Sequence, residues 1–84
     1  MPVYKDDRRD LTYREREILT LIKEGYSHKE IAGKLGIGAP TIKVSVRLIL
    51  ARLNARNTTH AVAIALREEL IDLKDRGIQD EKLR

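Results

Sequence analysis

The sequence predicts an all-α domain of four helices, and three observations support this fold class. Apolar residues recur at intervals of three and four in four successive segments, which is the spacing of one buried helical face. Residues that cap or end helices, namely Ser, Thr, Asn and Gly, separate those segments. No segment alternates apolar and polar residues as a strand does. The 84 residues suffice for one small domain.

The first helix is expected to begin after Thr12 and to end before Gly25. Thr12 and Glu15 are spaced as a capping box, in which each side chain accepts a hydrogen bond from the other residue's backbone N–H. Glycine suits the left-handed position that follows a helix. The buried face of this helix is expected to comprise Ile18, Leu19, Leu21 and Ile22.

The second helix is expected to be only about two turns long. Ser27 and Glu30 repeat the capping-box spacing at its start, and Gly36 and Gly38 follow closely at its end. Its inward face is expected to comprise Ile31, Ala32 and Leu35.

The third helix is expected to start near Pro40, which is tolerated in a first turn. Its single buried seam, with spacings of four, three and four, is Ile42, Val46, Ile49 and Leu53. The whole chain has 17 Lys and Arg against 13 Asp and Glu, and residues 39–57 contain four of those cations and no acid. The net charge of +4 therefore equals the charge of this one segment. A short helix, a tight turn and a helix with a basic outer face are typical of a helix-turn-helix that binds the DNA major groove.

A fourth helix rich in alanine is expected after a break at residues 54–57. Thr58 or Thr59 should cap it, and it should run through Ile71 to about Arg76, where Gly77 stops it. Residues 1–10 are expected to form a flexible arm, residues 11–76 the domain, and residues 77–84 a C-terminal tail.

The composition argues against several classes of function. There is no Cys, and the two His, His28 and His60, lack the companions of a zinc site. Without a nucleophile–base pair or a phosphate-binding glycine loop, we expect no catalysis, cofactor or metal. No apolar run approaches the roughly 20 residues of a membrane span. The N-terminus lacks the apolar stretch of a secretory signal, so a cytoplasmic location is expected.

Three ordered blocks together resemble the LuxR/GerE-type four-helix DNA-binding domain of bacterial transcription regulators. They are LTYREREIL, EGYSHKEIAGKLGIGAPTIKVSVRLILARL and AVAIALREELI, and the resemblance covers Leu11 to Ile71. It implies that the second and third helices form the helix-turn-helix and that the fourth mediates dimerisation. Since only ten residues precede the domain, the chain looks like a stand-alone, GerE-like member or an excised domain.

The resemblance also implies roles for individual residues. The base-reading positions are Lys43, Val44 and Arg47, of which Arg47 can bond bidentately to guanine and Val44 can touch a thymine methyl. The positions that contact the DNA backbone are Ser27, Lys29, Thr41, Ser45 and Arg52. Arg52 suits a structural role equally well, because cations stabilise the C-terminal end of a helix.

Of the positions that depart from the family pattern, two bear on DNA affinity and sequence preference. Gly38 stands where Ser or Thr usually caps the third helix, and Ser45 stands where His is common. A glycine cap costs only a few tenths of a kcal/mol relative to serine. Tyr13 and Tyr26 are expected to cover the edge of an aliphatic core.

The fourth helix is expected to form a dimer interface. Its small residues permit close approach of a second helix, and the expected interface is His60, Ala63, Ile64 and Arg67, while Ala61, Val62 and Ala65 face the core. An apolar row of Leu66, Leu70 and Leu73 is explained either by self-association or by a C-terminal tail that folds back over it.

The expected function is sequence-specific binding of double-stranded DNA by a homodimeric transcription regulator. The alternative is a module of the same fold that binds RNA polymerase, a sigma factor or another regulator, with DNA binding weakened or lost. Gly38, Ser45 and the apolar row motivate this alternative.

Overall fold

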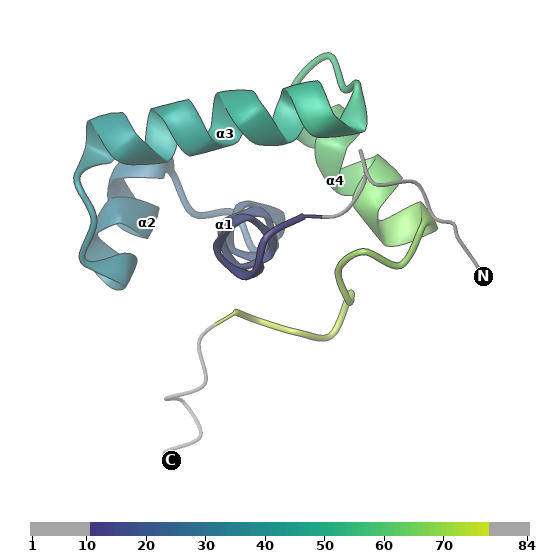
Figure 1. The fold of residues 1–84 in the computed structure, drawn as a ribbon. Coiled ribbons are helices and arrows are strands. Elements are labelled where there is room, and N and C mark those ends of the chain that lie inside the picture. Colours follow the sequence, from purple (N-terminus) through teal and green to yellow (C-terminus); the bar gives the residue numbers. More distant parts are fainter. Residues whose placement is uncertain (1–10, 78–84) are drawn as a thin grey trace.

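The computed structural model describes residues 11–77, and these form four helices joined by short turns (Figure 1). The helices are α1 (Tyr13–Lys23), α2 (His28–Leu35), α3 (Ala39–Leu53) and α4 (Thr58–Arg67). Within residues 11–77 there is no strand, so the all-α fold class is confirmed. The expected arm at residues 1–10 and the tail from residue 78 onward lie outside the described residues.

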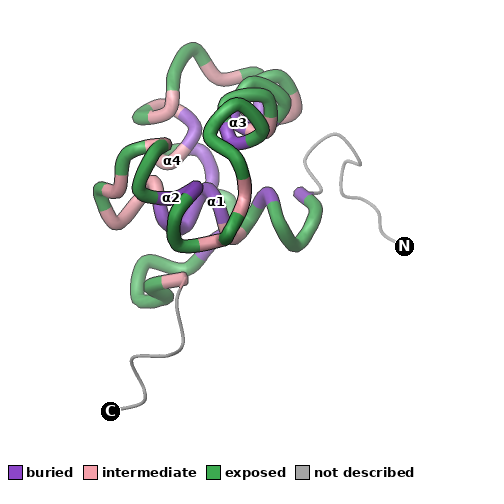
Figure 2. Tube along the Cα trace, turned by 90° about the vertical axis from the view of Figure 1, so that its left-hand side faces the viewer, coloured by how far each residue is buried: buried purple, intermediate pink, exposed green. Residues whose placement is uncertain are grey.

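The longest helix, α3, lies across the other three. It contacts α1, α2 and α4, and α1 in turn contacts α2 and α4. In Figure 1, α3 runs along the top of the molecule with α1 seen end-on beneath it. Buried residues gather in the centre and on the inner side of α3 (Figure 2). The core is aliphatic, and its fully buried large side chains are Ile18, Leu19, Leu21, Ile31, Ile42, Ile49 and Leu53.

Both predicted capping boxes are confirmed. The Thr12 hydroxyl accepts from the Glu15 N–H at 3.0 Å, and the Glu15 carboxylate accepts from the Thr12 N–H at 2.9 Å. Ser27 and Glu30 exchange the same two bonds at the start of α2. Gly25, just after α1, has a φ of 98°. The Gly25 N–H donates to the Ile22 carbonyl and the Tyr26 N–H to the Leu21 carbonyl, which closes the helix in a Schellman arrangement.

The predicted seam of α3 is also confirmed, since Ile42, Val46, Ile49 and Leu53 are all buried. Gly38 is the N-cap of this helix and supplies no side-chain hydrogen bond there. Asn54 ends the helix in the left-handed conformation, with φ 57° and ψ 43°.

The predicted start and end of α4 are wrong. The cap is Asn57 rather than Thr58 or Thr59, because the Asn57 side chain accepts from the His60 N–H at 2.8 Å. The helix ends at Arg67 rather than near Arg76.

The early end of α4 has a packing reason. Glu69 adopts a φ of 60°, and the Leu70 N–H bonds back to the carbonyl of Ala65 at 2.7 Å, so the chain reverses direction. This reversal brings Ile71 into the core, where it is 6% exposed. If α4 continued to Arg76, Ile71 would lie further along the helix axis, away from this position in the core.

Residues 68–77 then return along α1. The Lys23 ammonium donates to the backbone carbonyls of Leu73 at 2.7 Å and Asp75 at 2.5 Å. Of the predicted apolar row, Leu66 and Leu70 are half-buried and Leu73 stays exposed. The described part of the C-terminal region therefore folds back on the domain. This is one of the two explanations offered for the apolar row, the other being self-association.

The two tyrosines behave differently from one another. Tyr26 packs against the core under the Lys34 ammonium, which lies 4.4 Å from the ring centroid. Tyr13 is 78% exposed, so its expected core contact is wrong. It lies two positions before the buried Glu15, about 200° away around the helix. In the part of the chain that is described, no helix is long and apolar enough to cross a membrane.

Candidate nucleic-acid interface

The turn between α2 and α3 fixes the relative placement of the two helices. Gly36 ends α2 in the left-handed conformation with a φ of 68°. The next N–H, from Ile37, donates to the Ala32 carbonyl at 3.0 Å, and the Ile37 side chain packs against the core. With α2 held against α3, the pair has the arrangement expected of a helix-turn-helix.

The outward face of α3 carries the predicted base-reading side chains together. Lys43, Val44 and Arg47 are all exposed and point away from the buried seam, with Val44 opposite it and Lys43 on one flank. Thr41 is exposed as well, near the start of the helix, whereas Ser45 is half-buried on one flank. A phosphate or base could therefore reach Thr41 more readily than Ser45.

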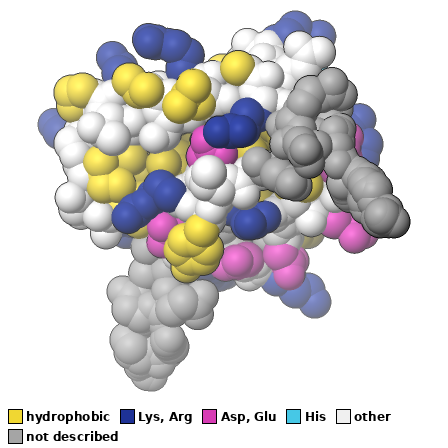
Figure 3. All heavy atoms as spheres, in the orientation of Figure 1, with side chains coloured by type: hydrophobic (Ala, Val, Ile, Leu, Met, Phe, Trp, Pro, Cys, Tyr) yellow, Lys and Arg dark blue, Asp and Glu magenta, His cyan; other side chains and the backbone are white. Residues whose placement is uncertain are grey.

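This face has no negative charge of its own, because α3 contains no Asp or Glu. In Figure 3, dark-blue and yellow side chains follow the upper edge of the molecule, where α3 lies, and most of the magenta ones lie lower. A basic surface without interspersed acids attracts a polyanion such as DNA.

The start of α2 offers two of the predicted backbone contacts. Ser27 and Lys29 are both exposed there. The Ser27 oxygen accepts from the Glu30 N–H at 3.1 Å, which leaves the hydroxyl hydrogen able to donate to a phosphate oxygen.

Arg52, another predicted backbone contact, is engaged within the domain. Its Nε lies 3.1 Å from each carboxylate oxygen of Glu15. The Glu15 side chain is 8% exposed and that of Arg52 is 39% exposed. One carboxylate therefore caps α1 and also holds the C-terminal end of α3, which favours the structural role for Arg52. The two residues are 37 positions apart, so no local sequence pattern indicated this pair.

Leu48 also lies on the exposed side of α3, and the sequence alone indicated no role for it. It is 50% exposed, close to the 51% of Val44. Its position four residues after Val44 was the available indication that it lies on the same face as Val44.

The expected dimer residues on α4 do not all lie on the outside. Ala63 and Arg67 are exposed, and His60 is half-buried with its Nδ1 accepting from the Arg56 N–H at 3.0 Å. Ile64 is 7% exposed and belongs to the core cluster, so its placement in the interface is wrong. The apolar residues of α4 surround much of the helix, and the side that packs on α1 and α3 takes Ile64 with Ala61 and Ala65.

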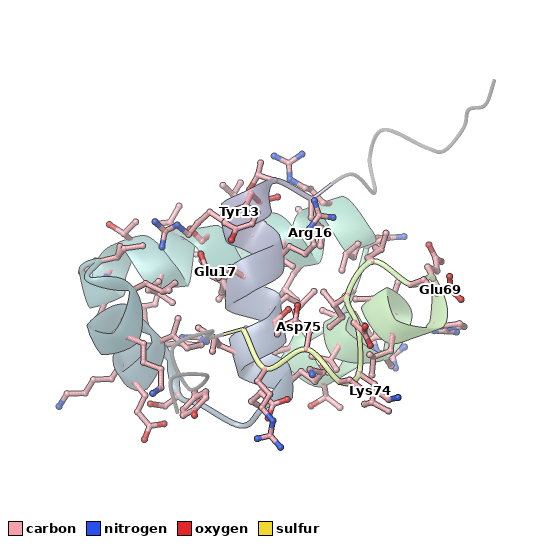
Figure 4. All side chains as sticks on the ribbon, turned by 90° about the horizontal axis from the view of Figure 1, so that it is seen from below. Tyr13, Arg16, Glu17, Glu69, Lys74 and Asp75 are labelled. Atoms are coloured by element: carbon pink, nitrogen blue, oxygen red, sulfur yellow. The ribbon has the colours of Figure 1, made fainter. Side chains whose placement is uncertain are left out.

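A hollow of about 620 Å³ lies between α1 and the returning C-terminal segment. Its lining combines apolar residues (Leu66, Leu70 and Ile71) with acidic ones (Glu69, Asp72 and Asp75) and one cation, Arg16. Figure 4 shows Arg16 and Glu17 on α1 and Asp75 on the segment beside it. The C-terminal segment that lines this hollow runs on the side of α1 away from α3 (Figure 1).

Ionisable groups near this segment form ion pairs, in which Glu24 lies beside Lys23 and Arg76. The hydrogen bond from Lys23 lowers the pKa of Glu24 below its ordinary value, against an opposing effect of partial burial, and the charges of Lys23 and Arg76 lower it further. Among residues 11–77, no group of three His, Cys, Asp or Glu side chains could hold a metal ion.

Known proteins are similar to this chain in sequence. Residues 9–65 match the GerE family model, described as bacterial regulatory proteins of the luxR family. The chain is 40% identical over 67 residues to the oxygen regulatory protein NreC of Staphylococcus carnosus, a match covering 80% of this chain and 31% of NreC. It is 46% identical over 61 residues to the response regulator protein VraR of Staphylococcus aureus, covering 73% of this chain and 29% of VraR. The matched region therefore spans less than a third of either relative.

Proposed function

This chain belongs to the luxR family of bacterial regulatory proteins, and on that premise we propose that it binds double-stranded DNA to regulate transcription. The observation that carries the proposal is the exposed, acid-free face of α3 with Lys43, Val44 and Arg47 on it. A helix of this kind fits the major groove, where side chains can reach base edges. The unit that binds is proposed to be residues 11–76, because Ile71 belongs to the same core.

Individual side chains take different parts in this proposal. Arg47 and Lys43 read guanine by donating to O6 and N7, and Val44 contacts a thymine methyl. Ser27, Lys29, Thr41 and Ser45 contact phosphates and so position the domain without reading sequence. Arg52 adds positive charge while its Nε stays bound to Glu15.

The test is a titration of the protein against random and selected duplexes over a range of salt. Affinity should fall steeply with salt, because neutralised phosphates release counterions. Arg47→Ala should cost about 1–3 kcal/mol on the selected site and relax specificity at one base pair. Lys29→Ala should weaken binding to both duplexes equally and reduce the salt slope by about one.

Lys74→Ala is the matched control, since Lys74 is exposed on the C-terminal segment rather than on the face of α3. It should leave specificity unchanged. Equal losses for Arg47→Ala on selected and random DNA would refute the base-reading role.

We also propose that the protein acts in the cytoplasm as a homodimer that meets through the outward side of α4. Support comes from the exposed Ala63, whose small side chain permits close helix approach, with His60 and Arg67 beside it. A two-fold dimer should bind two half-sites about one helical turn apart. Sedimentation of Ala63→Arg, compared with the unsubstituted chain, should show loss of the dimer. Equal sedimentation of the two would contradict this interface.

The alternative function, docking on RNA polymerase or another regulator, has one structural feature in its favour. The hollow beside α1 is lined by apolar side chains and by three acidic ones against one cation, Arg16. A segment that binds there would need apolar and basic residues. Absence of salt-dependent duplex binding would favour this alternative over the DNA-binding proposal.

A further inference from the structure

The DNA-facing side of α3 carries an exposed aliphatic pair next to its cations. Val44 is 51% and Leu48 is 50% exposed. Among the described residues, only Tyr13 and Leu73 are other large apolar side chains with comparable exposure, and neither lies on α3. The outer face of a surface helix is ordinarily polar. An apolar partner would remove these two half-exposed aliphatic side chains from water, which is favourable.

The pair forms a row along the helix. Residues four apart lie on the same face, about 6 Å apart along the axis at 1.5 Å per residue. Lys43 and Arg47 are also four residues apart and form a second row. Each of them immediately precedes a member of the aliphatic row in the sequence. The exposed face of α3 thus presents an aliphatic row and a cationic row side by side.

We infer that Leu48 determines sequence specificity by contacting a second thymine methyl, close to the one contacted by Val44. This inference rests on the proposed DNA-binding function and extends it to a residue outside the base-reading set. The thymine methyl is the apolar group that the major groove offers, whereas the other base-edge groups there donate or accept hydrogen bonds. Bases on one strand rise about 3.4 Å per step. A 6 Å spacing therefore places the two thymines about two base pairs apart.

Duplex DNA fits this surface better than a protein partner does. A protein covering Val44 and Leu48 would also cover Lys43 and Arg47, whose charges would then need acidic partners. DNA supplies both requirements at once, because methyl groups and guanine acceptors line the groove between two rows of phosphates.

The experiment begins with a binding site selected from a random pool at fixed salt. Each thymine of that site is then replaced, one at a time, by deoxyuridine, which removes only the methyl group. For the unsubstituted protein, affinity should fall about fourfold at each of two positions, the loss expected for one methyl-sized group of roughly 0.8 kcal/mol. Leu48→Ala should abolish this sensitivity at one position and keep it at the other. Val44→Ala should do the converse.

Leu73→Ala is the matched control, because Leu73 is also an exposed leucine, at 69%, but lies on the C-terminal segment, and it should keep both sensitivities. Leu48→Ala should fold normally, since the site is half exposed and alanine favours a helix; circular dichroism checks this. Salt-dependent binding with no sensitivity to deoxyuridine would overturn this inference but leave the proposed DNA-binding function standing. Weakened self-association of Leu48→Ala without altered deoxyuridine sensitivity would overturn it in favour of a protein contact. Absence of salt-dependent binding would overturn the proposed function and this inference with it.

Discussion

Replacing Arg52 with Met should lower the free energy of unfolding by about 1–2 kcal/mol. Arg52 Nε lies 3.1 Å from both oxygens of the Glu15 carboxylate, whose side chain is 8% exposed. A hydrogen bond to a charged group contributes about 1.5–3 kcal/mol. The 39% exposure of Arg52 screens part of that interaction, and fully exposed pairs contribute only about 0.2–1 kcal/mol. The expected loss lies between these limits.

A double-mutant cycle isolates the pair. Glu15→Gln removes the charge but keeps an acceptor for the Thr12 N–H, since glutamine also serves in a capping box. Denaturant unfolding of the two single variants and the double variant should give a coupling of about 1 kcal/mol. In thermal melting, each kcal/mol should shift the midpoint by about 4–8 °C in a domain of this size.

Arg56→Met is the matched control. It also removes one cation from the acid-free segment, but the structure shows no ion pair for the Arg56 side chain within residues 11–77. Both variants should weaken random duplex binding by a similar factor, and only Arg52→Met should lose stability. Equal unfolding free energies, with a coupling below about 0.3 kcal/mol, would refute the structural role and return Arg52 to the phosphate contacts.

Three further outcomes are expected. Gly25→Ala should lower the free energy of unfolding by about 1–2 kcal/mol, because its φ is 98°. Gly33→Ala, in open space inside α2, should raise it by up to about 1 kcal/mol. Thermal melting shows whether each variant is less or more stable than the parent. Ile64→Ala should cost about 2–5 kcal/mol in denaturant unfolding, because the side chain lies in the core, and a loss below 1 kcal/mol would contradict that placement. Glu24 stabilises the fold above its ordinary pKa, and this contribution is lost as the pH falls through its lowered pKa. Glu24→Gln should therefore melt with less acid dependence than the parent, and identical melting profiles against pH would count against the Lys23 contact.

Features set by neighbouring residues were predictable from the sequence. Each capping box needs only two side chains three positions apart, and Gly25 lies just after Glu24, the C-cap of α1. The four-residue seam of α3 fixed which side faces inward, and therefore also which side presents Lys43, Val44 and Arg47. For these elements, the local pattern and the final packing favour the same conformation.

Features set by distant contacts were not predictable. The end of α4 depends on Glu69 accepting a left-handed conformation so that Ile71 can be buried. Ile64 lies in a stretch with apolar residues on several faces, so periodicity alone could not say which face meets α1 and α3. The Glu15–Arg52 pair joins residues 37 positions apart. In each case tertiary burial decided between conformations that the local sequence leaves open.

The helix proposed to read DNA also organises the core, and this has a consequence for how variants should be interpreted. Because α3 contacts all three other helices, a substitution in its seam, such as one at Ile49, will lower DNA affinity by unfolding the domain. Substitutions at Arg47 or Leu48 remove exposed groups and leave that seam intact. Arg52 lies between these classes, since it is charged and partly exposed yet bound to a buried carboxylate. Affinity and unfolding free energy must therefore be measured on the same variants, because only a loss of affinity without a loss of stability assigns a side chain to the DNA.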